Sequence, residues 1–278
     1  MSTTQIHLLD PCAGMVLVVG SDGTRLLYGS QIGIGSANEV LQRLFEVLED
    51  GKIDYFVHTG IETEGAVSVG DLTDMFPVGT CLEPAGEGFA MSQLYTNFRA
   101  EREVDTLEPD DIYELGETQV RIIASPHGRD TAEGKLRPVA LHVAHGEEAT
   151  GGSLLCTGAM NGLDWLDIGE DAARLFQADV LVIDGRHPLD VILTARDRGL
   201  VSAEPLRWIA PKTVMLGTDP EGENKLRVAA RELYGHFARQ NPGGSGLVEL
   251  SGKAWTSLTL DGATAKFDTE PRALGKVA

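Results

Sequence analysis

The sequence predicts an α/β fold in which two mixed sheets lie between layers of helix. The chain opens with three strand-like segments, QIHLLD, MVLVVGS and RLLYGS, followed by a helix and a fourth strand, IDYFVHTG. It closes with three more, LVELS, AWTSLTL and ATAKFDT, which are expected to form a β-meander. Strands near both ends that enclose helices indicate two similar halves within a single domain, residues 1–278.

The first helix is expected from Ala37 to Glu49, with Ser36 as its N-cap and Gly51 at its end. Apolar residues recur at helical spacing and predict the buried face: Val40, Leu41, Leu44, Phe45 and Leu48. The glycines that follow the third strand do not form GxGxxG, so a dinucleotide-binding unit is disfavoured.

The middle of the chain repeats this pattern. We expect short helices around a strand in DLTDMFPVGTCLEP and MSQLYTNFRAERE. We expect a two-strand unit in IYELGETQVRIIASP and a hairpin with a polar tip in RPVALHVAHGEEATGGSLLCTGAM. GEDAARLFQ predicts a short helix. The nearly continuous apolar run of ADVLVIDG predicts a strand that is buried on both faces. A strand in KTVMLGTDP and a helix over residues 225–240 complete the order.

The composition excludes several classes of function. The formal net charge of −19 argues against a protein that binds nucleic acid or an anionic membrane directly, because Lys and Arg carry the affinity for phosphate. Cys12, Cys81 and Cys156 are widely spaced in apolar surroundings, which predicts buried thiols in a reducing compartment. MSTTQIHLLD does not read as a signal peptide, and no run approaches the ~18 apolar residues of a membrane span, so we expect a cytoplasmic protein.

Five segments occur in the order of the landmarks of a known family. DPCAGMVLVV stands where the family has DVGQGDAxLI, and RLLYGSQ where it has an ILIDAG-like turn. TGIETEG matches its THxDxDH loop, LLCTGAM its LLTGD, and ADVLVIDGRHP its ADVLKVGHHGS. Over nearly its whole length the chain thus resembles the metallo-β-lactamase fold, and within it the ComEC-like branch of hydrolases. The resemblance implies a four-layer αββα sandwich.

That family holds one or two metal ions, usually zinc, with His and Asp side chains, so that a bound water ionises and attacks a phosphoryl or acyl centre. In this chain the matching positions are changed: Gly60 and Gly65 for histidines, Glu62 and Glu64 for aspartates, Ala159 for the bridging aspartate, and Gly185 and Arg186 for the paired histidines. Two glutamates without imidazoles hold a hard cation only weakly, and an arginine repels a metal ion or pairs with a glutamate. The resemblance therefore implies no bound metal and no cofactor.

What remains is a vestigial pocket. Its members are expected to be Thr59, Glu62, Glu64, His127, Asp184, Arg186 and His187. A relocated site for zinc or manganese, built from His127, His187, Asp184 and one of the two glutamates, stays open as an alternative. His58, His142 and His145 have no metal-ligand spacing, and Cys156 lies in the apolar run SLLCTG, which favours a core thiol over a nucleophile.

Three functions follow from these residues. The first is a catalytically inactive, metal-free protein that serves as a binding or scaffold subunit, with a partner protein or a second copy of itself. The second is a metal-dependent hydrolase, a phosphodiesterase, nuclease or esterase, with the rearranged site. The third is an acidic mimic of nucleic acid, which would require the carboxylates to gather on one face.

Overall fold

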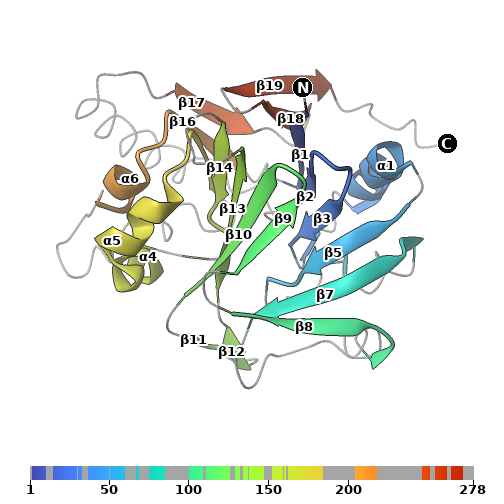
Figure 1. The fold of residues 1–278 in the computed structure, drawn as a ribbon, viewed down its shortest axis with the longest axis horizontal. Coiled ribbons are helices and arrows are strands. Elements are labelled where there is room, and N and C mark those ends of the chain that lie inside the picture. The colour runs from blue at the N-terminus through green and yellow to red at the C-terminus, as the bar shows by residue number, and fades with distance from the viewer. Residues whose placement is uncertain are drawn as a thin grey trace.

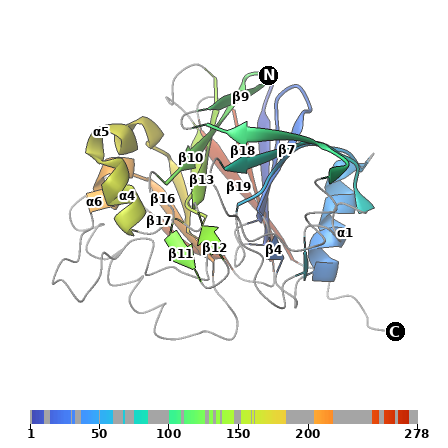
Figure 2. The same cartoon turned by 90° about the horizontal axis from the view of Figure 1, so that it is seen from below.

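The computed structural model of the protein consists of two large sheets with helices on their outer faces (Figures 1 and 2). It describes residues 2–10, 15–29, 31–32, 37–49, 51–59, 67–68, 75–84, 100–108, 111–125, 129–131, 134–136, 138–146, 152–158, 160, 162–183, 204–217, 246–250, 254–261 and 264–271. The layers are arranged as helix, sheet, sheet and helix, which confirms the predicted αββα sandwich.

The first sheet has eight strands in the order β19-β18-β1-β2-β3-β5-β7-β8. Their bounds are β1 Thr4–Asp10, β2 Met15–Val19, β3 Arg25–Tyr28, β5 Ile53–Val57, β7 Val78–Pro84, β8 Glu103–Leu107, β18 Ala254–Leu260 and β19 Ala265–Pro271. The strands from β19 to β3 pair antiparallel, and those from β3 to β8 pair parallel. The sheet is therefore mixed, as predicted.

The second sheet has seven strands in the order β17-β16-β15-β14-β13-β10-β9. Their bounds are β9 Ile112–Leu115, β10 Thr118–Ala124, β13 Val139–His145, β14 Ser153–Cys156, β15 Val180–Ile183, β16 Thr213–Gly217 and β17 Gly246–Leu250. Strands β14 to β17 pair parallel and the rest antiparallel, so this half repeats the plan of the first. Two small pairs complete the strands: β4 (Gln31–Ile32) with β6 (Val67–Ser68), and β11 (Arg129–Thr131) with β12 (Gly134–Leu136).

The helices cover opposite faces of the sandwich. Helix α1 (Ala37–Leu48) lies on the outer face of the first sheet. The outer face of the second sheet carries α4 (Gly162–Ile168), α5 (Glu170–Ala173), the 3₁₀ turn η1 (Arg174–Phe176) and α6 (Glu204–Ile209). None of the described helices is long and apolar enough to cross a membrane.

Three apolar clusters fill the spaces between the layers. The largest lies between the sheets and joins residues such as Ile6 and Val18 to Leu141 and Val180. A second packs the second sheet against its helices around Trp165, and a third packs the first sheet against α1. Strand β15 is buried along its whole length, which confirms the prediction made from its apolar run.

Two details of the sequence prediction were wrong. The last three strands do not form a meander, because β17 pairs in parallel with β16 in the second sheet, while β18 and β19 belong to the first. Phe45 was expected in the buried face of α1 but is 54% exposed, and its ring lies 4.5 Å from that of Phe76. Among the other expected face positions, Val40, Leu44 and Leu48 are fully buried and Leu41 is partly buried.

Asp179 joins three strands of the second sheet. Its Oδ2 accepts hydrogen bonds from the backbone N–H groups of Gly152 and Ser153, and its Oδ1 lies 2.5 Å from Lys212 Nζ. Burial alone would raise the pKa of Asp179, but the hydrogen bonds from Lys212 and from the two backbone groups outweigh burial and lower it. The ionised carboxylate thus fixes the starts of β14 and β16 next to β15.

Buried thiols were predicted, and Cys81 and Cys156 confirm this for the two cysteines that the structure describes. Each is at most 2% exposed and forms no disulfide with another described residue. Cys12 lies outside the described residues, as does the helix expected over residues 225–240.

Candidate functional site

The carboxyl ends of the parallel strands in both sheets meet at one end of the sandwich. The Tyr28 hydroxyl at the end of β3 donates a hydrogen bond of 2.8 Å to the carbonyl oxygen of Val139 in the second sheet. Gly158, just after β14, packs against the same hydroxyl. Loops that follow parallel strands of both sheets therefore leave from one edge, where sites in folds with parallel strands commonly lie.

Gly158 fits this edge only because it has no side chain. Its φ of +52° is in the left-handed region, and a Cβ atom there would lie 2.2 Å from Tyr28 Oη and 2.5 Å from the Val139 carbonyl oxygen. The backbone after β14 is thus pressed against Tyr28. Thr157 holds this backbone in place, since its N–H donates to the carbonyl oxygen of Val182 at 3.0 Å.

His58 and Thr59 follow β5 at this edge. His58 is 2% exposed, its N–H donates to the carbonyl oxygen of Leu82 at 3.0 Å, and its ring lies edge-on to Phe56 with 6.3 Å between the ring centres. These contacts agree with the interpretation of His58 as a core histidine. Thr59 is partly buried and is the one member of the expected pocket that the structure describes.

Three buried polar side chains at the same edge were not singled out in the sequence. Glu83, near the end of β7, is 8% exposed. After β10, Ser125 is fully buried and its hydroxyl donates to Asp164 of α4 at 2.9 Å. The signal for Glu83 was present, because CLEP places an acid directly after a buried strand, as TGIETEG does.

The contact between Ser125 and Asp164 fixes the point from which the following loop leaves. The Ser125 N–H also donates to the carbonyl oxygen of Pro138 at 2.8 Å, so backbone and side chain are both held. Asp164 lies in the first turn of α4 and is 4% exposed. Ser125 lies two residues before His127 in the sequence.

The other predicted positions lie outside the described residues. They are Gly60, Glu62, Glu64, Gly65, His127, Ala159, Asp184, Gly185, Arg186 and His187. The structure does describe the strands that lead to them, β5, β10, β14, β15 and β16. Among the residues that the structure describes, no three His, Cys, Asp or Glu side chains form a group that could hold a metal ion.

The described polar side chains at this edge have a structural role. The Ser125 hydroxyl, the Asp164 carboxylate and the Tyr28 hydroxyl are engaged in hydrogen bonds within the protein. Each is buried, so each stabilises the ends of the strands through a contact that water does not weaken. They position loops and leave any contact with a ligand to the loop residues.

Comparisons with known proteins rest on structure alone. No protein-family model matches the sequence, and no curated protein matches it. Among solved structures, the metallo-β-lactamase fold protein YhfI from Bacillus subtilis is 14% identical, with 88% of this chain and 96% of that chain covered and a TM-score of 0.52. Unliganded yeast PDE1 is 9% identical, with 94% and 99% covered and a TM-score of 0.56.

A third similar structure is larger. CmlA, a diiron β-hydroxylase from Streptomyces venezuelae, is 13% identical, with 88% of this chain but 52% of that chain covered and a TM-score of 0.52. Identities this low establish a shared architecture and leave activity open. Together with the two mixed sheets and their outer helices, these likenesses show that this chain has the metallo-β-lactamase fold.

Proposed function

We propose that this protein is a catalytically inactive, metal-free member of its fold that binds or scaffolds a partner protein. The observation that carries the proposal is the set of residue types at the family's ligand positions. Gly60, Gly65, Gly185 and Ala159 have no side-chain donor for a metal ion. Arg186 adds a permanent positive charge, which disfavours a cation nearby.

The framework around these positions supports a role other than metal chemistry. Strand ends, the Tyr28 contact and the anchor of Ser125 on Asp164 are all in place, while the ligand residues are replaced. A fold kept in this way points to a surface or a pocket that still binds something. The five landmarks favour the ComEC-like branch as its origin, and the proposal places the protein in the cytoplasm.

Metal analysis tests the proposal directly. Protein purified without chelator is expected to hold zinc and manganese far below one ion per chain, and to leave a generic phosphodiester unhydrolysed when either metal is added. One ion per chain, with turnover that His127→Ala or His187→Ala abolishes, would instead establish a hydrolase with a relocated site. Tyr28→Phe is the control, since it changes the same end of the sandwich without removing a candidate ligand.

The charge distribution narrows the chemistry of the partner. Residues 101–117, which include β8 and β9, contain eight acidic residues and a single basic one, Arg102. Strands β8 and β9 are the edge strands of the two sheets, so these acids lie along the edges of the sandwich. A second copy of this acidic chain would be repelled there, whereas a basic partner would be attracted.

Aromatic rings lie among these acids. Tyr55 of β5 and Tyr113 of β9 come from different sheets, and their ring centres are 5.8 Å apart. Burial, then the carboxylates of Asp111 and Asp105, raise the pKa of Tyr113 to about 12, so the phenol is neutral near pH 7. Neutral rings beside carboxylates suit the Lys and Arg side chains of a partner, which gain both ion pairing and cation–π contact.

Charge reversal tests this proposed contact. The double variant Asp105→Lys with Asp111→Lys is expected to weaken the binding of a short oligo-arginine peptide by at least about tenfold, which corresponds to about 1.4 kcal/mol. The matched control is the double variant Asp268→Lys with Glu270→Lys on β19, at the far edge of the first sheet, which changes the net charge by the same amount. If titration calorimetry shows equal losses of affinity for the two double variants, the peptide responds to the net charge alone and does not prefer the acidic edge.

A further inference from the structure

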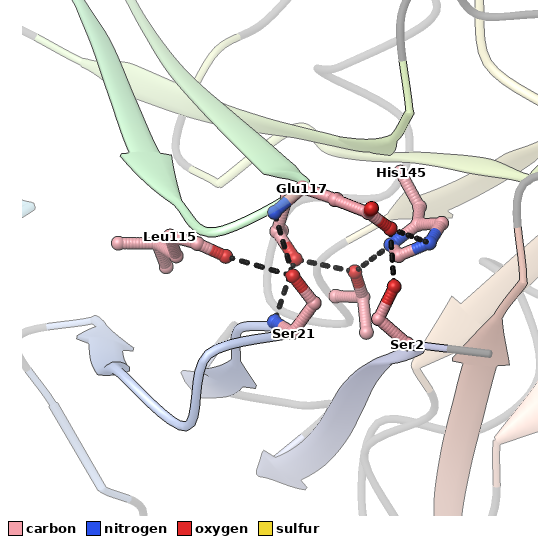
Figure 3. A network of polar contacts seen from close by, with 7 residues as sticks. Ser2, Ser21, Leu115, Glu117 and His145 are labelled. Carbon is pink, nitrogen blue, oxygen red and sulfur yellow. Dashed lines mark hydrogen bonds and ion pairs between the residues drawn. The ribbon is translucent and has the colours of Figure 1, made fainter.

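A chain of polar contacts joins the two sheets at the end opposite the candidate site (Figure 3). The first sheet contributes Thr4, at the start of β1, and Ser21, in the turn after β2. The second sheet contributes Thr118, at the start of β10, and His145, at the end of β13. Thr4 and Thr118 are fully buried, and the His145 side chain is 5% exposed, so water does not replace these contacts.

The distances define an unbroken path. The Ser21 N–H donates to Thr118 Oγ1 at 3.1 Å, and Thr118 Oγ1 lies 2.6 Å from Thr4 Oγ1. Thr4 Oγ1 lies 2.9 Å from His145 Nδ1. On the other side of the ring, His145 Nε2 lies 3.6 Å from Glu117 Oε2, which also accepts a hydrogen bond from the Ser2 hydroxyl.

Counting hydrogens gives the direction of donation for a given tautomer of the neutral ring. A carboxylate accepts and does not donate, so the Glu117 carboxylate, 3.6 Å from Nε2, favours the tautomer of His145 that carries its one N–H on Nε2. Nδ1 is then an acceptor, and the Thr4 hydroxyl must donate to it. Because one hydroxyl has one hydrogen, Thr118 must donate to Thr4.

We propose that this contact between the sheets is a proton-operated switch in which proton uptake by His145 reverses the direction of donation along the path. The cationic ring carries a hydrogen on Nδ1 as well, and that hydrogen must point to Thr4 Oγ1. The Thr4 hydroxyl then turns its hydrogen to Thr118 Oγ1, which accepts from Thr4 and from the Ser21 N–H together. One proton enters from solvent, and no covalent bond other than N–H changes.

The groups around the ring act differently on the two protonation states. Among the described residues, Glu117 is the carboxylate at ion-pair distance, and it attracts the cationic ring. The β1 and β10 strands present the hydroxyls of Thr4 and Thr118, and the Thr118 hydrogen turns away from Thr4 when the ring is cationic. In the turn after β2, Asp22 accepts from the backbone N–H of Thr24 in its own turn. The switch therefore changes the hydrogen-bond directions and keeps the sheets joined.

The change reaches the backbone of the first sheet at Ser21. Its N–H shares Thr118 Oγ1 with a second donor after protonation, and its own hydroxyl accepts from the Glu117 N–H at 2.6 Å. The Ser21 N–H also contacts the carbonyl oxygen of Leu115 at 3.2 Å, so it has another acceptor available in the second sheet. Proton uptake by His145 in the second sheet thus changes the hydrogen bonding of Ser21, in a turn of the first sheet.

Nuclear magnetic resonance of nitrogen-15-labelled protein tests the switch. In alkaline solution the His145 ring is expected to carry its hydrogen on Nε2. On acidification the Ser21 amide resonance is expected to move with the same midpoint as the ring. A neutral ring with its hydrogen on Nδ1, or a Ser21 amide that does not follow the ring, would overturn the proposal.

Three variants separate the switch from ordinary titration. Thr118→Val removes the shared hydroxyl. The ring is then expected to take up its proton as before, while the Ser21 amide resonance no longer moves with it. Thr118→Ser keeps the hydroxyl and is expected to retain the movement of the Ser21 resonance. Glu117→Gln is on the exposed side of the ring and is expected to fold normally. It should reduce the population with hydrogen on Nε2, and an unchanged ring in this variant would contradict the argument.

Discussion

Acidification is expected to destabilise the protein through His142, a buried residue of β13. The side chain is 6% exposed, and its Nε2–H donates to the carbonyl oxygen of Gln177 at 3.1 Å. Burial lowers the pKa of His142 from 6.5 to about 4; the contact with Gln177 opposes this change, and the charge of Arg121 adds to it. The folded protein therefore holds this ring neutral over a range in which the unfolded chain binds a proton.

The sign and size follow from this difference. Between about pH 6.5 and about pH 4 the unfolded state binds more protons, so the free energy of unfolding falls as the pH falls. The full difference corresponds to about 3 kcal/mol, of which about 2 kcal/mol is lost between about pH 7 and about pH 5. The contribution is complete above about pH 6.5 and absent below about pH 4.

Urea unfolding of wild type and His142→Gln at the two pH values measures this term. Glutamine keeps a side-chain N–H that can donate to Gln177 and removes the titration. The variant should lose about 2 kcal/mol less than wild type between about pH 7 and about pH 5. Equal losses in the two proteins, with the same near-ultraviolet dichroism near pH 7, would refute the assignment of the neutral ring to His142.

Three further sets of substitutions test the contacts described above. Gly158→Ala should destabilise the protein by more than about 2 kcal/mol in urea unfolding, because the new methyl group meets Tyr28 Oη, and Tyr28→Phe should relieve part of that loss in the double variant. Asp179→Asn should cost about 1–3 kcal/mol near pH 7 and less in acid, since the lost contacts need the ionised carboxylate. Leu44→Ala should cost about 2–5 kcal/mol and Phe45→Ala clearly less, and equal melting-temperature shifts would contradict the exposure of Phe45.

The spacing of hydrophobic residues along the sequence was enough to predict the sandwich. Alternation and apolar runs located most strands, and helical spacing located α1 to within a residue of its end. The pairing of the strands could not be predicted in the same way, because the spacing of hydrophobic residues carries no information on which strand lies beside which. LVELS and AWTSLTL are separated by two residues, yet β17 and β18 lie in different sheets.

The pocket and the replaced ligands stay predictions, because apart from Thr59 their residues lie outside the described part of the chain. Motif positions depend on a pattern of residue types, so a replacement of the ligands can be proposed from Gly60 or Arg186 without coordinates. Ser125 and Asp164 are far apart in sequence and belong to no motif, so only their meeting in the fold reveals the pair. Tyr28 was part of a strand in the prediction, and its contact with Gly158 required the relative placement of the two sheets.

The pairing of β1 bears on how the chain is made. Thr4 lies opposite Leu260, so the first strand is completed on one side by a strand that is synthesised much later. Until β18 emerges, one edge of β1 exposes unpaired backbone groups in an apolar strand, which is a template for pairing with other chains. The late closure of this edge predicts slow folding dominated by long-range contacts and a nascent chain that depends on chaperones until β18 is available.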